Sequence, residues 1–182
     1  ETALLPLLCY FKKEKNMKNI LLATDLDASA DRALERAFHI AQEHNAKLHI
    51  LHVISHYSGT TLNNSLQEEA ESLIQRTIHN YKDNAPLLEI QVTTVLSKDI
   101  FLEILEHAHN TRADLIVMGI HGKTKLKDLF VGTTIERVIR KGNTPVLMVK
   151  DKPLCPYQKV VTSIDYAPAS RAALRLATVS YT

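Results

Sequence analysis

The chain has little cysteine or glycine and no tryptophan, and its scarce residues limit the kinds of functional site that it can contain. Its 182 residues include no tryptophan and two cysteines, Cys9 and Cys155, which are too far apart to form a short-spaced metal or redox pair. This usage favours a reducing compartment, the cytoplasm. The apolar runs stay below the roughly 18 residues of a membrane span. A formal net charge of +2 gives no strong basic field. We therefore expect neither a nucleic-acid nor a membrane partner.

The residues that are abundant suit a globular domain, with 45% hydrophobic and 23% charged. Apolar runs predict strands at 19–25, 47–55, 88–96, 113–119 and 144–150. Segments with helical spacing of apolar residues lie between them, at 28–46, 63–83, 99–111 and 133–142. Ser29 is a candidate N-cap, and Gly142 is a natural C-terminal stop. The alternation predicts an α/β fold with a parallel sheet and helices on both faces.

Residues 1–16 differ from the rest of the chain. Their short apolar part precedes the basic residues, which is the reverse of a secretory signal. Met17 then begins "MKNILLATDLD", so we expect Met17 to be the natural start of a domain at 17–150, preceded by added or upstream residues. A genuine short N-terminal extension is the alternative.

A repeat lies near the end of the chain. Residues 158–182 align without gaps to residues 18–42, so that Asp165 matches Asp25 and Leu174 matches Leu34. This pattern predicts the first strand and helix of a truncated second domain, after a linker at 151–157. A chance similarity between two βα units is the alternative.

Three of the five glycines lie in one segment, "MGIHGKTKLKDLFVGTT", residues 118–134. It starts at the end of the predicted fourth strand, and Gly132 directly precedes a helix. The first N–H groups of a helix lack intrahelical partners and attract anions, so Gly132, Thr133 and Thr134 suit a phosphate. Asp25, at the end of the first strand, faces the same crevice in a parallel sheet and could bind a ribose. On the glycines alone, an ordinary tight loop remains equally open.

Other nucleotide and metal motifs fit less well. "GKT" at 122–124 is no P-loop, because Val117 stands where that motif needs glycine. No Rossmann glycine pattern follows the first strand. A metal site at His49, His52 and His56 is disfavoured, since strand alternation places His49 and His52 on opposite faces.

The glycine segment and its surroundings resemble the ATP-binding universal stress proteins. That subgroup carries G-2x-G-9x-G-(S/T), which Gly119, Gly122, Gly132 and Thr133 match in full. The resemblance covers about residues 18–150, and 158–182 resemble the start of a second copy. It implies an open five-stranded parallel sheet of order 3-2-1-4-5, adenine nucleotide alpha hydrolase-like, which binds ATP, with Mg²⁺, across the crevice.

The resemblance also implies which residues bind the nucleotide. Adenine would lie near Val53 and the end of the first strand, and the ribose on Asp25 and Gly119. The phosphates would lie on Gly122, Gly132, Thr133 and Thr134. The implied set is Thr24, Asp25, Val53, Met118, Gly119, His121, Gly122, Gly132, Thr133 and Thr134.

The function implied is that of a regulatory ATP-binding protein of the stress response, at most a slow ATPase. It would form a homodimer through the fifth strand, 144–150, or pair that strand with a second domain. One alternative is a non-nucleotide, dimerising scaffold of the same fold. Another is an adenine nucleotide alpha hydrolase-type enzyme, which is disfavoured because "ATDLDAS" after the first strand contains no glycine.

Overall fold

A computed structural model describes residues 17–26, 30–55, 60–82, 85–120 and 133–150, together with isolated positions at 161, 168, 170, 173, 174 and 177. The chain divides into one compact unit of Met17–Leu154 and another that combines the two terminal segments. The predictions for 1–16, for the linker at 151–157 and for the second copy at 158–182 fall outside the described residues, apart from those isolated positions. They stay predictions.

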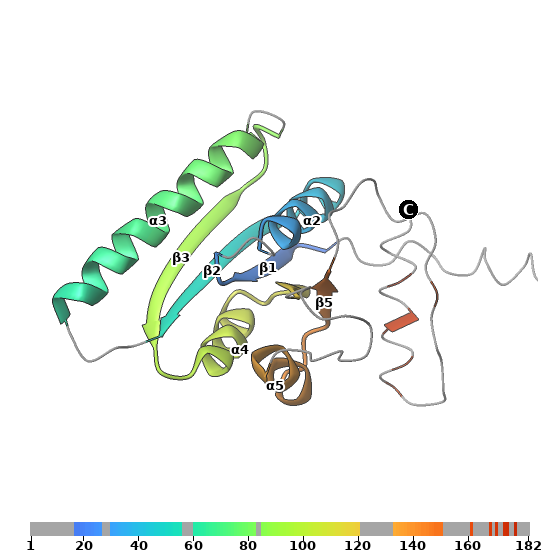
Figure 1. The fold of residues 1–182 in the computed structure, drawn as a ribbon. Coiled ribbons are helices and arrows are strands. Elements are labelled where there is room, and N and C mark those ends of the chain that lie inside the picture. Colours follow the sequence, from blue (N-terminus) through green and yellow to red (C-terminus); the bar gives the residue numbers. More distant parts are fainter. Residues whose placement is uncertain are drawn as a thin grey trace, which may run out of the picture. The chain divides into compact units, whose positions relative to one another are not determined.

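The five strands form one parallel sheet with the order β3-β2-β1-β4-β5. The elements along the chain are β1 (Asn19–Thr24), α2 (Ala30–His44), β2 (Lys47–Ser55), α3 (Thr60–Lys82), β3 (Ile90–Ser97), α4 (Ile100–Asn110), β4 (Leu115–Gly119), α5 (Thr133–Lys141) and β5 (Val146–Val149). Figure 1 shows the sheet between α2 and α3 on one face and α4 and α5 on the other. The predicted fold class and strand order are confirmed.

The middle residues of the central strands β1 and β4 are apolar because helices cover both faces of these strands. Ile20, Leu21 and Leu22 of β1 are fully buried, as are Leu115, Ile116 and Val117 of β4. A buried parallel strand has no solvent face, so its sequence reads as a continuous apolar run. None of the described helices has the length and apolarity needed to cross a membrane.

Each face of the sheet has its own core. Leu21, Ala23 and Leu51 pack with Phe101 and Ile104 of α4 on one face. The ring of Phe101 also lies 3.6 Å below the guanidinium carbon of Arg137, which joins α4 to α5 by a cation–π contact. On the other face, the rings of Phe38 and Tyr81 meet with centroids 5.0 Å apart and join α2 to α3.

The ends of some elements differ from those expected. Helix α3 begins at Thr60, three residues before the predicted start at 63, and β3 begins at Ile90 instead of 88. The first turn of α3 reads "TTLN", which lacks the apolar spacing on which the prediction depended. Ser29, the candidate N-cap of α2, lies outside the described residues.

Gly142 follows the end of α5 as predicted, but for a different reason. None of the described glycines has a positive φ, so Gly142 does not adopt the left-handed cap conformation. A Cβ atom at this position would lie 2.7 Å from both Leu105 Cδ2 and the carbonyl oxygen of Val138. The Gly142 N–H donates to that same oxygen at 2.8 Å. Glycine is required here because a Cβ atom would lie too close to the backbone oxygen of Val138, in the last turn of α5.

We predict that Gly142→Ala destabilises the fold by about 1–3 kcal/mol, the usual cost of overpacking, because the backbone oxygen of Val138 cannot move aside cheaply. Urea unfolding would measure the loss. Lys141→Ala, at the exposed neighbouring residue, is the matched control and should change stability little. Equal midpoints for the two variants would contradict this account of Gly142.

Candidate functional site

The carboxyl ends of β1, β2 and β4 meet at one edge of the sheet. Thr24, the last residue of β1, pairs with His52 of β2, and Ala23 pairs with Met118 of β4. Val53 and Gly119 each follow one of these partners. Asp25 comes directly after β1 and is exposed. The structure therefore gathers the site residues predicted at the strand ends.

The exit of β1 has an unusual backbone. Leu26 has φ 62°, in the left-handed region that non-glycine residues seldom adopt. The Leu26 N–H donates to Thr24 Oγ1 at 3.1 Å, which ties the turn to the last residue of the strand. His52 contacts the same residue, since its Nδ1 lies 2.9 Å from the carbonyl oxygen of Thr24.

The side chains of Met118 and Val53 belong to the core beneath this edge. Met118 is 6% exposed and packs in the cluster under α4 and α5, against which Val53 also packs. A ligand at the edge could therefore reach the backbone of Met118 but not its side chain.

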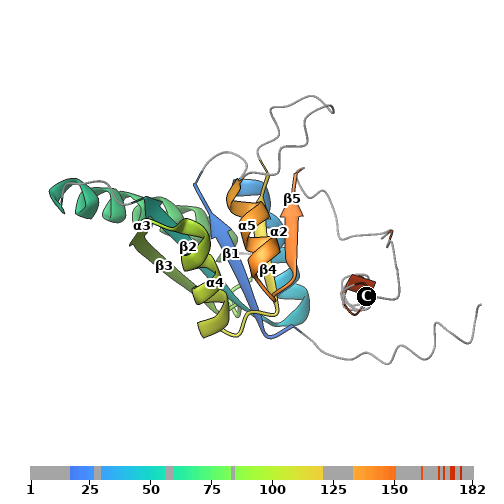
Figure 2. The same cartoon turned by 90° about the horizontal axis from the view of Figure 1, so that it is seen from below.

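The start of α5 lies toward the same edge, because a helix that joins two parallel strands must run back from their carboxyl ends. Figure 2 shows α5 lying along β4 and β5. Thr133, the first residue of the helix, is exposed, and Thr134 is half-buried. The N–H groups of this first turn have no intrahelical partners. His121, Gly122 and Gly132 lie outside the described residues.

The profile of the universal stress protein family matches residues 16–150. This chain belongs to the universal stress protein family. It is 32% identical to the universal stress protein MJ0531 of Methanocaldococcus jannaschii over 143 residues, which cover 75% of this chain and 84% of that protein.

Solved structures agree with the family and the fold. The structure of MJ0577, also a universal stress protein of Methanocaldococcus jannaschii, superposes with a TM-score of 0.64 at 31% identity, covering 75% of this chain and 97% of that one. A universal stress protein solved in complex with cAMP superposes with a TM-score of 0.60 at 24% identity, covering 74% and 98% of the two chains. At that lower identity the likeness shows the fold alone.

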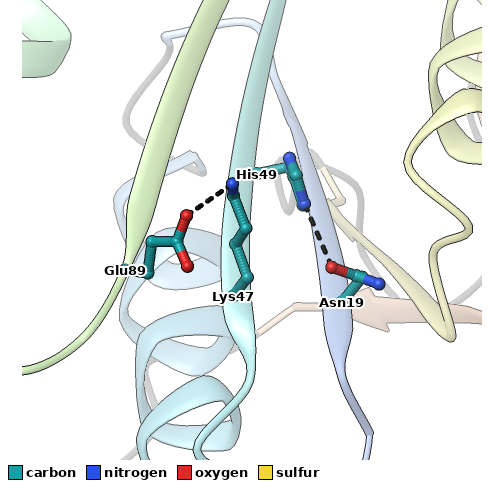
Figure 3. Close-up of polar contacts among 4 residues, drawn as sticks. All are labelled: Asn19, Lys47, His49 and Glu89. Atoms are coloured by element: carbon teal, nitrogen blue, oxygen red, sulfur yellow. Dashed lines mark hydrogen bonds and ion pairs between the residues drawn. The ribbon is translucent and has the colours of Figure 1, made fainter.

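A second polar cluster of this universal stress protein lies at the opposite, amino-terminal edge of the sheet (Figure 3). His49 Nε2 lies 3.4 Å from Asn19 Oδ1, and Lys47 forms an ion pair with Glu89 at 2.5 Å. The ring of His107, from α4, meets that of His49 with centroids 6.4 Å apart. Across the described part of the chain, no three side chains gather as metal ligands, so this cluster is not a metal centre of that kind.

Both histidines of the second cluster favour their neutral forms. Burial lowers the pKa of His49, and the Lys47 cation and His107 lower it further, against an opposing effect of Glu89. Burial likewise lowers the pKa of His107, against an opposing effect of Glu103. His49 Nδ1 and His107 Nε2 are buried with no hydrogen-bond partner among the described residues. Protonation at either site would place a charge in an apolar layer.

We predict that the protein loses stability as the pH falls below about 6.5, the usual histidine value. Below that pH the two histidines take up protons in the unfolded chain but not in the folded chain, because folding lowers their pKa values. Proton uptake therefore favours the unfolded state, and stability falls until the pH reaches the pKa values of the folded state. Urea unfolding at pH 7.5 and 5.5 measures the difference, and His107→Leu should reduce it. Ile104→Val, a buried apolar change on the same helix, is the control and should lower stability equally at both pH values. If His107→Leu showed the same difference in stability between the two pH values as the wild type, His107 would not be a source of the pH dependence.

Proposed function

We propose that this universal stress protein binds ATP as a regulatory signal of the stress response and hydrolyses it slowly or not at all. The observation that carries the proposal is the position of Asp25, which directly follows β1, and of Gly119, which ends the neighbouring strand β4. Strand order reverses between these two strands, and in open parallel sheets ligands bind at such a reversal.

The proposed contacts follow the geometry of that edge. Asp25 is exposed and would accept hydrogen bonds from the ribose hydroxyls, with Gly119 alongside. The adenine ring would lie over Val53, near Thr24 and the backbone of Met118.

The phosphates would lie against the glycine segment, at His121, Gly122, Gly132, Thr133 and Thr134. The start of α5 suits an anion, because its unpaired N–H groups carry the positive end of the helix dipole. Glu136 in the first turn pairs with Arg140 at 3.0 Å, which offsets its negative charge near the phosphates. A Mg²⁺ ion, which prefers oxygen ligands and keeps several waters, would bind the phosphates and a threonine hydroxyl.

The proposed slow hydrolysis of ATP follows from the roles proposed for the residues of the site. Each proposed contact binds or orients the nucleotide, and none is assigned to activate a water molecule. A universal stress protein of this fold has been solved in complex with cAMP, so the fold can accommodate an adenine nucleotide. The nucleotide would then bias assembly or partner choice. We place this activity in the cytoplasm, consistent with two widely spaced cysteines.

Assembly would use β5. This strand ends the described sheet and pairs with β4 alone among the described strands, so its other backbone edge is open to a second copy or to a second domain. Met148 on β5 is 38% exposed although it is apolar. We propose a homodimer through this strand, residues 144–150.

We expect calorimetric titration with ATP and Mg²⁺ to give a dissociation constant in the micromolar range or tighter. This corresponds to a binding free energy of about −8 kcal/mol or more negative. Asp25→Asn should weaken binding about tenfold or more, because an ionised acceptor is lost. Asp114→Asn is the matched control: Asp114 Oδ2 accepts from the backbone of Lys18 at 2.8 Å, at the opposite edge of the sheet. Folded, nucleotide-free protein that binds no ATP would favour the scaffold alternative.

For assembly, we expect the wild-type protein to elute as a dimer in light-scattering chromatography and Met148→Asp to shift it to monomer. A buried carboxylate in an apolar contact is costly, which is the reason for the expected shift. Leu102→Asp, at a 51% exposed residue of α4, is the control and should leave the dimer intact. A dimer that survives Met148→Asp would place the interface elsewhere.

A further inference from the structure

His52 is a polar side chain between the apolar residues Leu51 and Val53, in the carboxyl half of β2. It is half-buried, and its Nδ1 lies 2.9 Å from the backbone carbonyl oxygen of Thr24 on the neighbouring strand. A carbonyl oxygen only accepts hydrogen bonds, so Nδ1 carries the proton and donates. His52 thus holds the last carbonyl of β1.

Thr24 in turn holds the residue that follows Asp25. Its Oγ1 accepts the Leu26 N–H at 3.1 Å, and Leu26 has φ 62°. The left-handed conformation costs a non-glycine residue about 1–2 kcal/mol, so Leu26 adopts it only while its surroundings impose it. Asp25 lies between two residues whose backbones are held, one by His52 and the other by Thr24.

We infer that His52 is a positioning residue of the nucleotide site: through the Thr24 carbonyl it fixes the turn that directs Asp25 toward the crevice. The inference rests on the proposed ATP binding and deepens it. Without the donor at His52, the carbonyl of Thr24 loses a fixed partner and the turn at Asp25–Leu26 relaxes. A carboxylate that must be reordered on binding binds more weakly than a preorganised one.

The test uses two substitutions whose side chains have the same number of heavy atoms and the same branching at Cγ. His52→Asn keeps an N–H donor at the same number of bonds from the backbone as Nδ1, and His52→Leu removes the donor. Asparagine is the less favourable residue in a strand, so His52→Asn should be the less stable of the two. A merely structural role would therefore weaken ATP binding more in His52→Asn.

A positioning role predicts the opposite order. In calorimetric titration with ATP and Mg²⁺, His52→Leu should weaken binding about tenfold, the worth of one hydrogen bond, and His52→Asn should restore most of the affinity. Amide hydrogen exchange at Leu26, measured by NMR without nucleotide, should speed up in His52→Leu and stay near the wild-type rate in His52→Asn.

A double-mutant cycle identifies the route of the effect. If His52 acts through Asp25, then His52→Leu should weaken binding far less in the Asp25→Asn background than in the wild type. The inference would be overturned if the two substitutions weakened ATP binding additively. It would also be overturned if His52→Asn bound ATP more weakly than His52→Leu, in the order of their stabilities. Either result would leave the proposal of ATP binding itself standing. No ATP binding by the wild-type protein would overturn both proposals.

Discussion

Strand β1 is hydrogen-bonded along both edges, to β2 and to β4, and the rest of the structure depends on that double pairing. Its side chains bury against helices on both faces of the sheet. A strand held on four sides has little freedom, so the residues at its two ends are held in place with it. The carboxyl end carries Asp25, and the amino end is fixed where the backbone of Lys18 and Asn19 binds the Asp114 carboxylate.

The polar residues of the sheet divide between those two ends. At the carboxyl edge, His52 and Thr24 hold a turn in a conformation that costs energy, and that edge borders the proposed ATP site. At the amino edge, His49 and His107 remain neutral within an apolar layer. Each edge uses histidine differently: one as a hydrogen-bond donor to backbone, the other as a buried group whose protonation the fold resists.

The sequence predicts much of this molecule, and the exceptions have physical causes. All five predicted strands are present, and the signal is most continuous in β1 and β4, where burial on both faces leaves an apolar run. The family resemblance supplied the strand order. The conformation of Leu26 and the contact between His52 and Thr24 depend on which residues lie opposite across strands, which local patterns do not encode. Gly142 was expected for its helix-ending role, whereas the closeness of the Val138 backbone oxygen to the position of a Cβ atom decides it. The roles of Gly122 and Gly132 remain predictions from the motif.

The pairing of His49 with Asn19 also bears on how the sheet finds its alignment during folding. Successive residues of a strand point to opposite faces, so a slip of β2 by one position against β1 would carry His49 into the layer under α2 and α3. There it would lose the Asn19 oxygen and bury its ring nitrogens among aliphatic side chains. The neighbouring residues Leu48, Ile50 and Leu51 are nearly interchangeable in hydrophobicity, so they discriminate poorly between the two alignments. A polar residue among the apolar residues of β2 therefore penalises misaligned sheets that the hydrophobic effect alone would tolerate.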